Sequence, residues 1–166
     1  MDQSFDPTIP GFLQGEVSNV AISAPATFPP PALRRLVIDP SKPFDITVEW
    51  EIFGALVPLW LAPLAANWDV SVFAESIGPG PEVALGTATV PKTATVPCTV
   101  NQAQQNCTKY QATVTVPPGT LTEDVGSDSG TYKLVVTVFL DSALGAPGFD
   151  LTGFREGPII RVENPN

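Results

Sequence analysis

Apolar and polar residues alternate over long stretches of this chain. In Phe44–Phe53 every second residue is apolar, and the residues between them up to Glu51 are Asp, Thr or Glu. Thr131–Leu140 shows the same period of two, with Tyr, Leu and Val on the repeating positions. Successive side chains of an extended strand point to opposite faces, so this period predicts strands with one buried face. Shorter runs predict further strands at residues 36–39, 67–77, 82–90, 92–100, 109–116 and 158–163.

Turn signals separate these runs. Residues 78–81 read Gly-Pro-Gly-Pro, residues 117–119 read Pro-Pro-Gly, and no stretch has a sustained helical period. Several short strands divided by Gly- and Pro-rich turns are typical of a sandwich of two sheets. The pattern therefore predicts an all-β sandwich of seven to nine strands.

The first 36 residues differ from the rest, because prolines interrupt small apolar groups. Residues 16–23 have the composition of one strand, and Phe28 followed by three prolines favours polyproline II. We therefore expect an extended Pro-rich N-terminal arm over residues 1–36 and a sandwich domain over residues 37–166. The arm would lie either on its own sandwich or on a neighbouring subunit.

A short motif ahead of the strand Thr131–Leu140 has the pattern D-x-G-x-Y-x-L. It consists of Asp128, Gly130, Tyr132 and Leu134. This spacing resembles the start of strand F in immunoglobulin-like domains, where a tyrosine precedes the second core cysteine by two residues. Trp68 resembles the core tryptophan of strand C in those domains. The resemblance implies an immunoglobulin-like Greek-key sandwich, with Leu134 at the cysteine position and no specific family identified.

Composition narrows the classes of partner. The net charge is −9, which disfavours binding to phosphate backbones, so we expect no nucleic-acid partner. Only 15% of residues are charged and 43% are hydrophobic, so much apolar surface must be buried inside the protein or against a partner. The sequence predicts no secretory signal, and its longest apolar run, residues 53–66, is too short to span a bilayer.

The two cysteines enclose a polar segment between two predicted strands. Cys98 and Cys107 are an even pair, which favours a disulfide that closes a hairpin loop, and two free thiols are the alternative. A disulfide would favour an extracellular or particle-surface location. The sequence leaves the location itself undetermined.

The sequence has few candidate catalytic or metal-binding residues. The chain has no histidine, no zinc-binding cysteine spacing and no phosphate-binding glycine loop. Glu49 and Glu51 share one face of a strand, as the two carboxylates of a glycosidase do, but an alternating polar face is also where solvated charges belong. The acidic turn at residues 123–130 has oxygen ligands suited to calcium and equally suits a plain turn. We expect no catalytic residue, cofactor or metal, and hence no enzyme.

Two predicted loops are unusually apolar, namely residues 54–66 and 142–154. In an immunoglobulin-like sandwich these would be the B–C and F–G loops, which emerge at the same end. Six residues would then form one partner-binding surface: Leu59, Trp60, Leu61, Leu144, Phe149 and Phe154. Exposed apolar patches mark contacts with partners; the alternative is that the loops fold back and cap the core. The absence of flanking Lys and Arg argues against a membrane.

These features favour a non-catalytic structural or assembly subunit. It would associate with itself, or with a larger particle, fibre or surface layer, through the N-terminal arm and the apolar loops. The alternative is a recognition module that binds a protein or glycan through the end that carries both loops.

Overall fold

The computed structural model describes residues 5–23, 37–123, 126, 130–142 and 149–164. Its elements follow in chain order: β1 (Phe5–Asp6), β2 (Gln14–Ser23), β3 (Val37–Ile38), β4 (Phe44–Phe53), α1 (Val57–Leu61), β5 (Asn67–Ser76), β6 (Val83–Pro91), β7 (Thr108–Val116), β8 (Thr131–Leu140) and β9 (Leu151–Val162). Of the predicted sequence motif, Asp128 lies outside the described residues, as does Leu144 of the predicted partner-binding surface.

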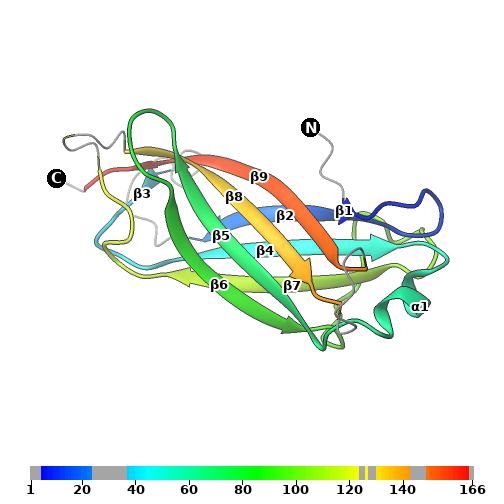
Figure 1. Ribbon diagram of the computed structural model, residues 1–166. Helices are drawn as coiled ribbons and strands as arrows, with labels where there is room; N and C mark the ends of the chain where they lie inside the picture. The colour runs from blue at the N-terminus through cyan, green and yellow to red at the C-terminus, as the bar shows by residue number, and fades with distance from the viewer. Residues whose placement is uncertain (1–4, 24–36, 124–125, 127–129, 143–148, 165–166) are drawn as a thin grey trace.

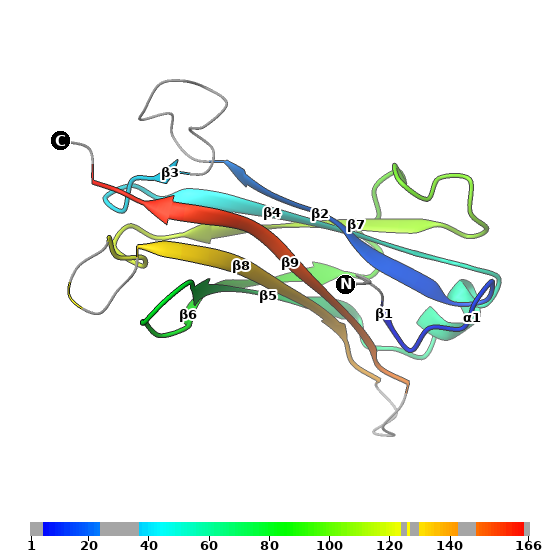
Figure 2. The same cartoon turned by 90° about the horizontal axis from the view of Figure 1, so that it is seen from above.

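The described strands form two sheets that pack face to face, which confirms the predicted all-β sandwich (Figures 1 and 2). The larger sheet has the order β1-β9-β8-β5-β6, with β3 added parallel to β9. The smaller sheet has the order β2-β4-β7, and all of its pairings are antiparallel. Of the two alternatives left open for residues 16–23, pairing within the same chain is the one observed, because β2 pairs with β4. β1 likewise pairs with β9.

The strands with the clearest alternation have the predicted bounds. β4 and β8 coincide with the predicted runs; buried and less buried side chains alternate along all of β8 and along β4 as far as Trp50. The predicted strand at residues 92–100 was wrong. This segment is a series of turns with one isolated bridge from Val96 to Lys109. Pro97 cannot donate to a ladder. The amides of Thr99 and Val100 instead donate to a side chain, which is described below.

Two further bounds differ from the prediction. α1 begins at Val57 within a predicted loop, and Pro58 is tolerated there because the first turn of a helix needs no N–H donor. β9 begins at Leu151, so the last part of the predicted loop 142–154 is strand. A Cβ at Gly153 would lie 2.5 Å from the Phe5 ring, so this glycine serves close packing and does not mark a loop.

Aromatic residues from both sheets fill one part of the core. Trp68 of β5 is fully buried, and its ring centroid lies 5.6 Å from that of Trp50 and 5.4 Å from that of Tyr110. Phe5 packs edge-on against Trp68 from β1. Trp50 and Tyr110 belong to the smaller sheet and Trp68 to the larger one. The cluster therefore joins the two layers.

Candidate functional site

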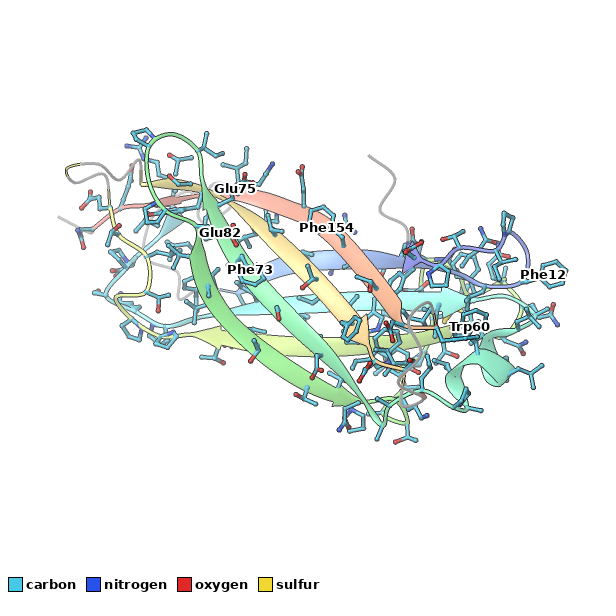
Figure 3. The ribbon with its side chains drawn as sticks, viewed as in Figure 1. Phe12, Trp60, Phe73, Glu75, Glu82 and Phe154 are labelled. Carbon is cyan, nitrogen blue, oxygen red and sulfur yellow. A yellow bond between two sulfur atoms is a disulfide. The ribbon has the colours of Figure 1, made fainter. Side chains whose placement is uncertain are left out.

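One end of the sandwich carries α1 and the turn before β2 (Figure 1), and Phe149, two residues before β9, contacts Trp60 of α1 there. Three large apolar side chains of these segments are exposed: Leu59 by 74%, Phe12 by 51% and Phe149 by 47%. Figure 3 shows Phe12 and Trp60 at this same end. We call the surface formed by Phe12, Leu59, Trp60 and Phe149 the apolar end.

The two predicted loops do meet at the apolar end. The ring centroids of Trp60 and Phe149 lie 5.6 Å apart, and Trp60 Nε1 donates to the Phe149 carbonyl oxygen at 3.1 Å. Ala65 N also donates to the carbonyl oxygen of Asp141 at 2.8 Å. These contacts join segments more than 70 residues apart in the sequence into one surface.

The first loop both covers the core and contributes to the surface. Val57 and Leu64 are buried in the core, and Trp60 and Leu61 are partly buried against it. Leu59 points outward from the same short helix. Some residues of this segment therefore cap the core, and Leu59 contributes to the exposed surface.

Phe154 does not join the apolar end. It lies inside β9, opposite Thr137 of β8, and its side chain is on the outer face of the larger sheet (Figure 3). Its place in the predicted patch was wrong because β9 begins three residues before it. Phe12 takes part instead, although it was assigned to the arm. The apolar pair Phe12-Leu13 next to Gly11 was the only signal in the sequence.

Hydrogen bonds hold α1 at both of its ends. The Lys92 ammonium donates to the carbonyl oxygens of Leu61, Ala62 and Leu64 at 2.8, 3.3 and 2.7 Å. A cation at this position suits the negative end of a helix. At the other end Leu56 N donates to the carbonyl oxygen of Phe12 at 2.8 Å. The apolar end is thus built on a braced backbone.

Gly54 joins β4 to this segment. Its φ is +127°, and a Cβ there would lie 2.3 Å from the Phe12 carbonyl oxygen. The Gly54 amide donates to the Gln105 carbonyl oxygen at 2.7 Å, and its own oxygen accepts from Asn106 Nδ2 at 3.3 Å. Segment 98–107 therefore contacts the start of the apolar end.

The predicted Cys98–Cys107 disulfide is confirmed. The loop that it closes lies over the three-stranded sheet, on the side away from the other sheet (Figure 2). Beneath this loop the side chain of Glu51 is fully buried. The interpretation of Glu51 as a solvated charge was therefore wrong, because a loop about 50 residues later in the sequence covers this part of the polar face.

The Glu51 carboxylate accepts five hydrogen bonds from the loop. Oε1 accepts from Thr99 N at 2.7 Å, Thr99 Oγ1 at 3.1 Å and Val100 N at 3.1 Å. Oε2 accepts from Asn101 N at 2.7 Å and Asn101 Nδ2 at 3.1 Å. Burial by itself raises the pKa of Glu51, but the amides of Thr99, Asn101 and Val100 outweigh it and hold the pKa below its ordinary value.

These contacts decide what the carboxylates can do. Glu49 is paired with Lys109 at 3.0 Å, and both oxygens of Glu51 face N–H and O–H donors. The two carboxylates are therefore not arranged to flank a substrate. Glu51 lies close to both cysteine sulfurs, but sulfurs joined in a disulfide are not thiolate ligands, so this group is not set up for a metal ion in the oxidised protein. Most of the acidic turn 123–130 lies outside the described residues.

No protein-family model matches the chain, and no curated protein matches it closely enough to be a relative. Within the described residues, no helix is long and apolar enough to cross a membrane.

Proposed function

We propose that this protein is a non-catalytic assembly module with an immunoglobulin-like fold, which associates with a second copy of itself through the apolar end. In immunoglobulin-like domains one sheet contains strands A, B and E, and the other contains G, F and C, with C′ added in variable-type domains. The orders β2-β4-β7 and β9-β8-β5-β6 fit this arrangement.

The tyrosine of the sequence motif gives a second line of support for that fold. Tyr132 is buried, and its hydroxyl donates to the backbone oxygen of Thr122 at 3.2 Å, ten residues earlier. A tyrosine at the start of strand F that bonds to upstream backbone is a hallmark of these domains. Trp68, in the position proposed for strand C, supports the same assignment through its place in the core.

The observation that carries the functional proposal is the exposure of Leu59, Phe12 and Phe149 on a braced backbone. Scattered exposed apolar residues are ordinary, but three large ones at the same end of the sandwich, with Phe149 packed against the partly buried Trp60, suit a partner. The segment predicted as an arm contributes Phe12 to it. Trp60 already uses its N–H to bond Phe149, which leaves an apolar face and favours a protein partner over a glycan.

Light scattering coupled to size-exclusion chromatography tests the proposal. The mass of the full chain should rise above 17.5 kDa as its concentration approaches about 1 mM, where an association of about 4 kcal/mol is half complete. The double variant Leu59→Ser with Phe149→Ser should stay monomeric. Ile159→Ser is the matched control, because Ile159 is 52% exposed and lies in the second half of β9.

Two outcomes would overturn self-association through this surface. One is a wild-type mass that stays at the monomer value at every concentration, which would leave recognition of a different protein as the better function. The other is an association that the double variant retains or that Ile159→Ser removes equally.

A further inference from the structure

The disulfide loop carries an anion-binding arrangement that is filled by the protein's own side chain. Three consecutive backbone amides directly after Cys98 point at the Glu51 carboxylate, those of Thr99, Val100 and Asn101. Successive N–H groups that converge in this way form a concave site for an anion. The loop is thus docked on the sheet chiefly through one buried charge.

Charges of every neighbouring strand face this site. Glu16 of β2 lies directly opposite Glu51 in the register of the sheet, and Lys109 of β7 lies opposite it on the other side. Like charges opposite each other destabilise a sheet. Asn101 Nδ2 separates the two carboxylates by donating to Glu16 at 2.7 Å and to Glu51 at 3.1 Å.

Lys109 does not neutralise Glu51 directly. Its ammonium lies 3.0 Å from a Glu49 oxygen and donates to Thr99 Oγ1 at 2.8 Å. The amides of the loop are therefore the principal partners of the Glu51 charge. If the loop moved away, Glu16, Glu49 and Glu51 would share one small area of sheet with a single lysine.

We infer that the Cys98–Cys107 disulfide and the Glu51 carboxylate form a redox-sensitive latch, which holds residues 98–107 on the outer face of the three-stranded sheet when oxidised and releases them when the disulfide is reduced. The cross-link joins residues nine apart and removes conformational freedom from the undocked loop. Without it, docking must order the whole loop against its conformational entropy. The water outside the sheet can then solvate the freed carboxylates.

The reductant is a dithiol. One of its thiolates attacks a cysteine sulfur and forms a mixed disulfide, and its second thiolate then attacks that mixed disulfide and releases the remaining cysteine sulfur. Cys98 and Cys107 each take up one proton to become thiols, and the dithiol ends as a disulfide. Both cysteines are partly exposed, so the reductant can reach the bond.

The latch is linked to the apolar end but does not rest on its proposed role. Gln105 and Asn106 lie within the disulfide loop and bond to both backbone groups of Gly54, which leads into α1. Release of the loop therefore removes contacts from the start of that segment. The latch depends only on the contacts of residues 98–107, whether or not the apolar end binds a second copy.

Hydrogen exchange of the full chain, followed by NMR at neutral pH with and without dithiothreitol, tests the latch. In the oxidised protein the amides of Thr99, Val100 and Asn101 should be protected by the buried carboxylate. In the reduced protein they should exchange about 100-fold faster or more, because the loop opens locally. The amides of Val136 and Val138 in β8 should stay protected in both states and serve as the internal control.

A variant cycle supplies an independent measurement. Glu51→Gln should destabilise the oxidised protein clearly and the reduced protein several-fold less in free energy, since the loop is already released. Asp45→Asn is the matched control, because Asp45 lies on the same face of β4 and bonds Thr115 outside the loop. Its effect should be the same in both redox states.

Three results would overturn the latch: loop amides that remain protected after reduction, a Glu51→Gln effect that is equal in both states, or loss of protection throughout β8 on reduction. The last would show that the disulfide supports the whole fold. If Glu51→Gln fails to fold, the exchange measurement on the wild type decides alone.

Discussion

Replacing Glu51 by glutamine probes the most highly bonded side chain in the described part of the chain. Glutamine keeps the shape of the side chain and one acceptor oxygen. If that oxygen occupies the position of Oε1, it still accepts from Thr99 and Val100. The amide NH₂ then faces the two donors of Asn101, so the backbone N–H loses its acceptor and Nδ2 keeps only its bond to Glu16.

The magnitude follows from those two donors. A buried donor without an acceptor costs about 1–3 kcal/mol, and Asn101 is only partly buried, so the total should be about 2–4 kcal/mol. Urea unfolding at pH 7, followed by the fluorescence of the buried tryptophans, measures this loss. A difference from the wild type below about 0.5 kcal/mol, the size expected for an ordinary surface change, would refute the assignment of Glu51 as the anchor of the loop.

The pH dependence of stability checks the same assignment of Glu51. The pKa of Glu51 is lowered in the folded protein, since the loop amides outweigh the effect of burial. A carboxyl of this kind stabilises the fold above its unfolded pKa, and this stabilisation is lost as the pH falls through its folded pKa. The advantage of the wild type over Glu51→Gln should therefore be constant near neutral pH and shrink below about pH 4. An advantage that stayed the same down to about pH 2 would contradict the lowered pKa.

Three further substitutions test the supports of the fold and of the apolar end. Lys92→Met should lower the free energy of unfolding in urea by about 1–3 kcal/mol, because three carbonyl oxygens lose a charged donor, and an unchanged value would mean that water replaces it fully. Gly54→Ala should cost about 2–4 kcal/mol in the same assay, since its Cβ would meet the Phe12 carbonyl oxygen and its φ is positive, and a neutral result would refute that close contact. Tyr132→Phe should cost about 1 kcal/mol and lower the Tm by several degrees, and no change in Tm would mean that the bond to Thr122 contributes nothing.

The strands that the sequence revealed are those whose signal is local. Apolar residues recur at every second position of β4 and β8, so the sequence alone predicts which side chains face the core. β9 was recognised only from Pro158 onward, because Gly153 and Gly157 resemble loop residues when read alone. Their reason is tertiary, since Phe5 packs where a Gly153 side chain would be and Val20 lies close to Gly157. Such close approach between distant segments leaves no periodic trace.

The sequence predicted that the two apolar loops meet, but part of the predicted set of residues was wrong. The composition of residues 54–66 and 142–154 indicated that apolar loops would meet, and the Trp60–Phe149 contact shows that they do. Phe154 was included because the start of β9 was placed too late, and Phe12 was missed because its neighbours looked like an arm. Strand boundaries depend on which backbone groups find partners, and those partners lie far away in the chain.

By itself, then, the sequence determined the class of fold, the alternating faces of β4 and β8, and the pair of cysteines able to close a loop. Each depends on the spacing of residues that are close in the sequence, because the geometry of an extended chain fixes which side chains share a face. Only the tertiary structure decided that Glu51 is buried, because the three amides that hold its charge come from a loop about 50 residues later. It also decided that β2 completes a sheet, since a strand's position depends on the partner with which it bonds. Charge burial and strand pairing are relations between distant segments, and they exist only once the chain has folded.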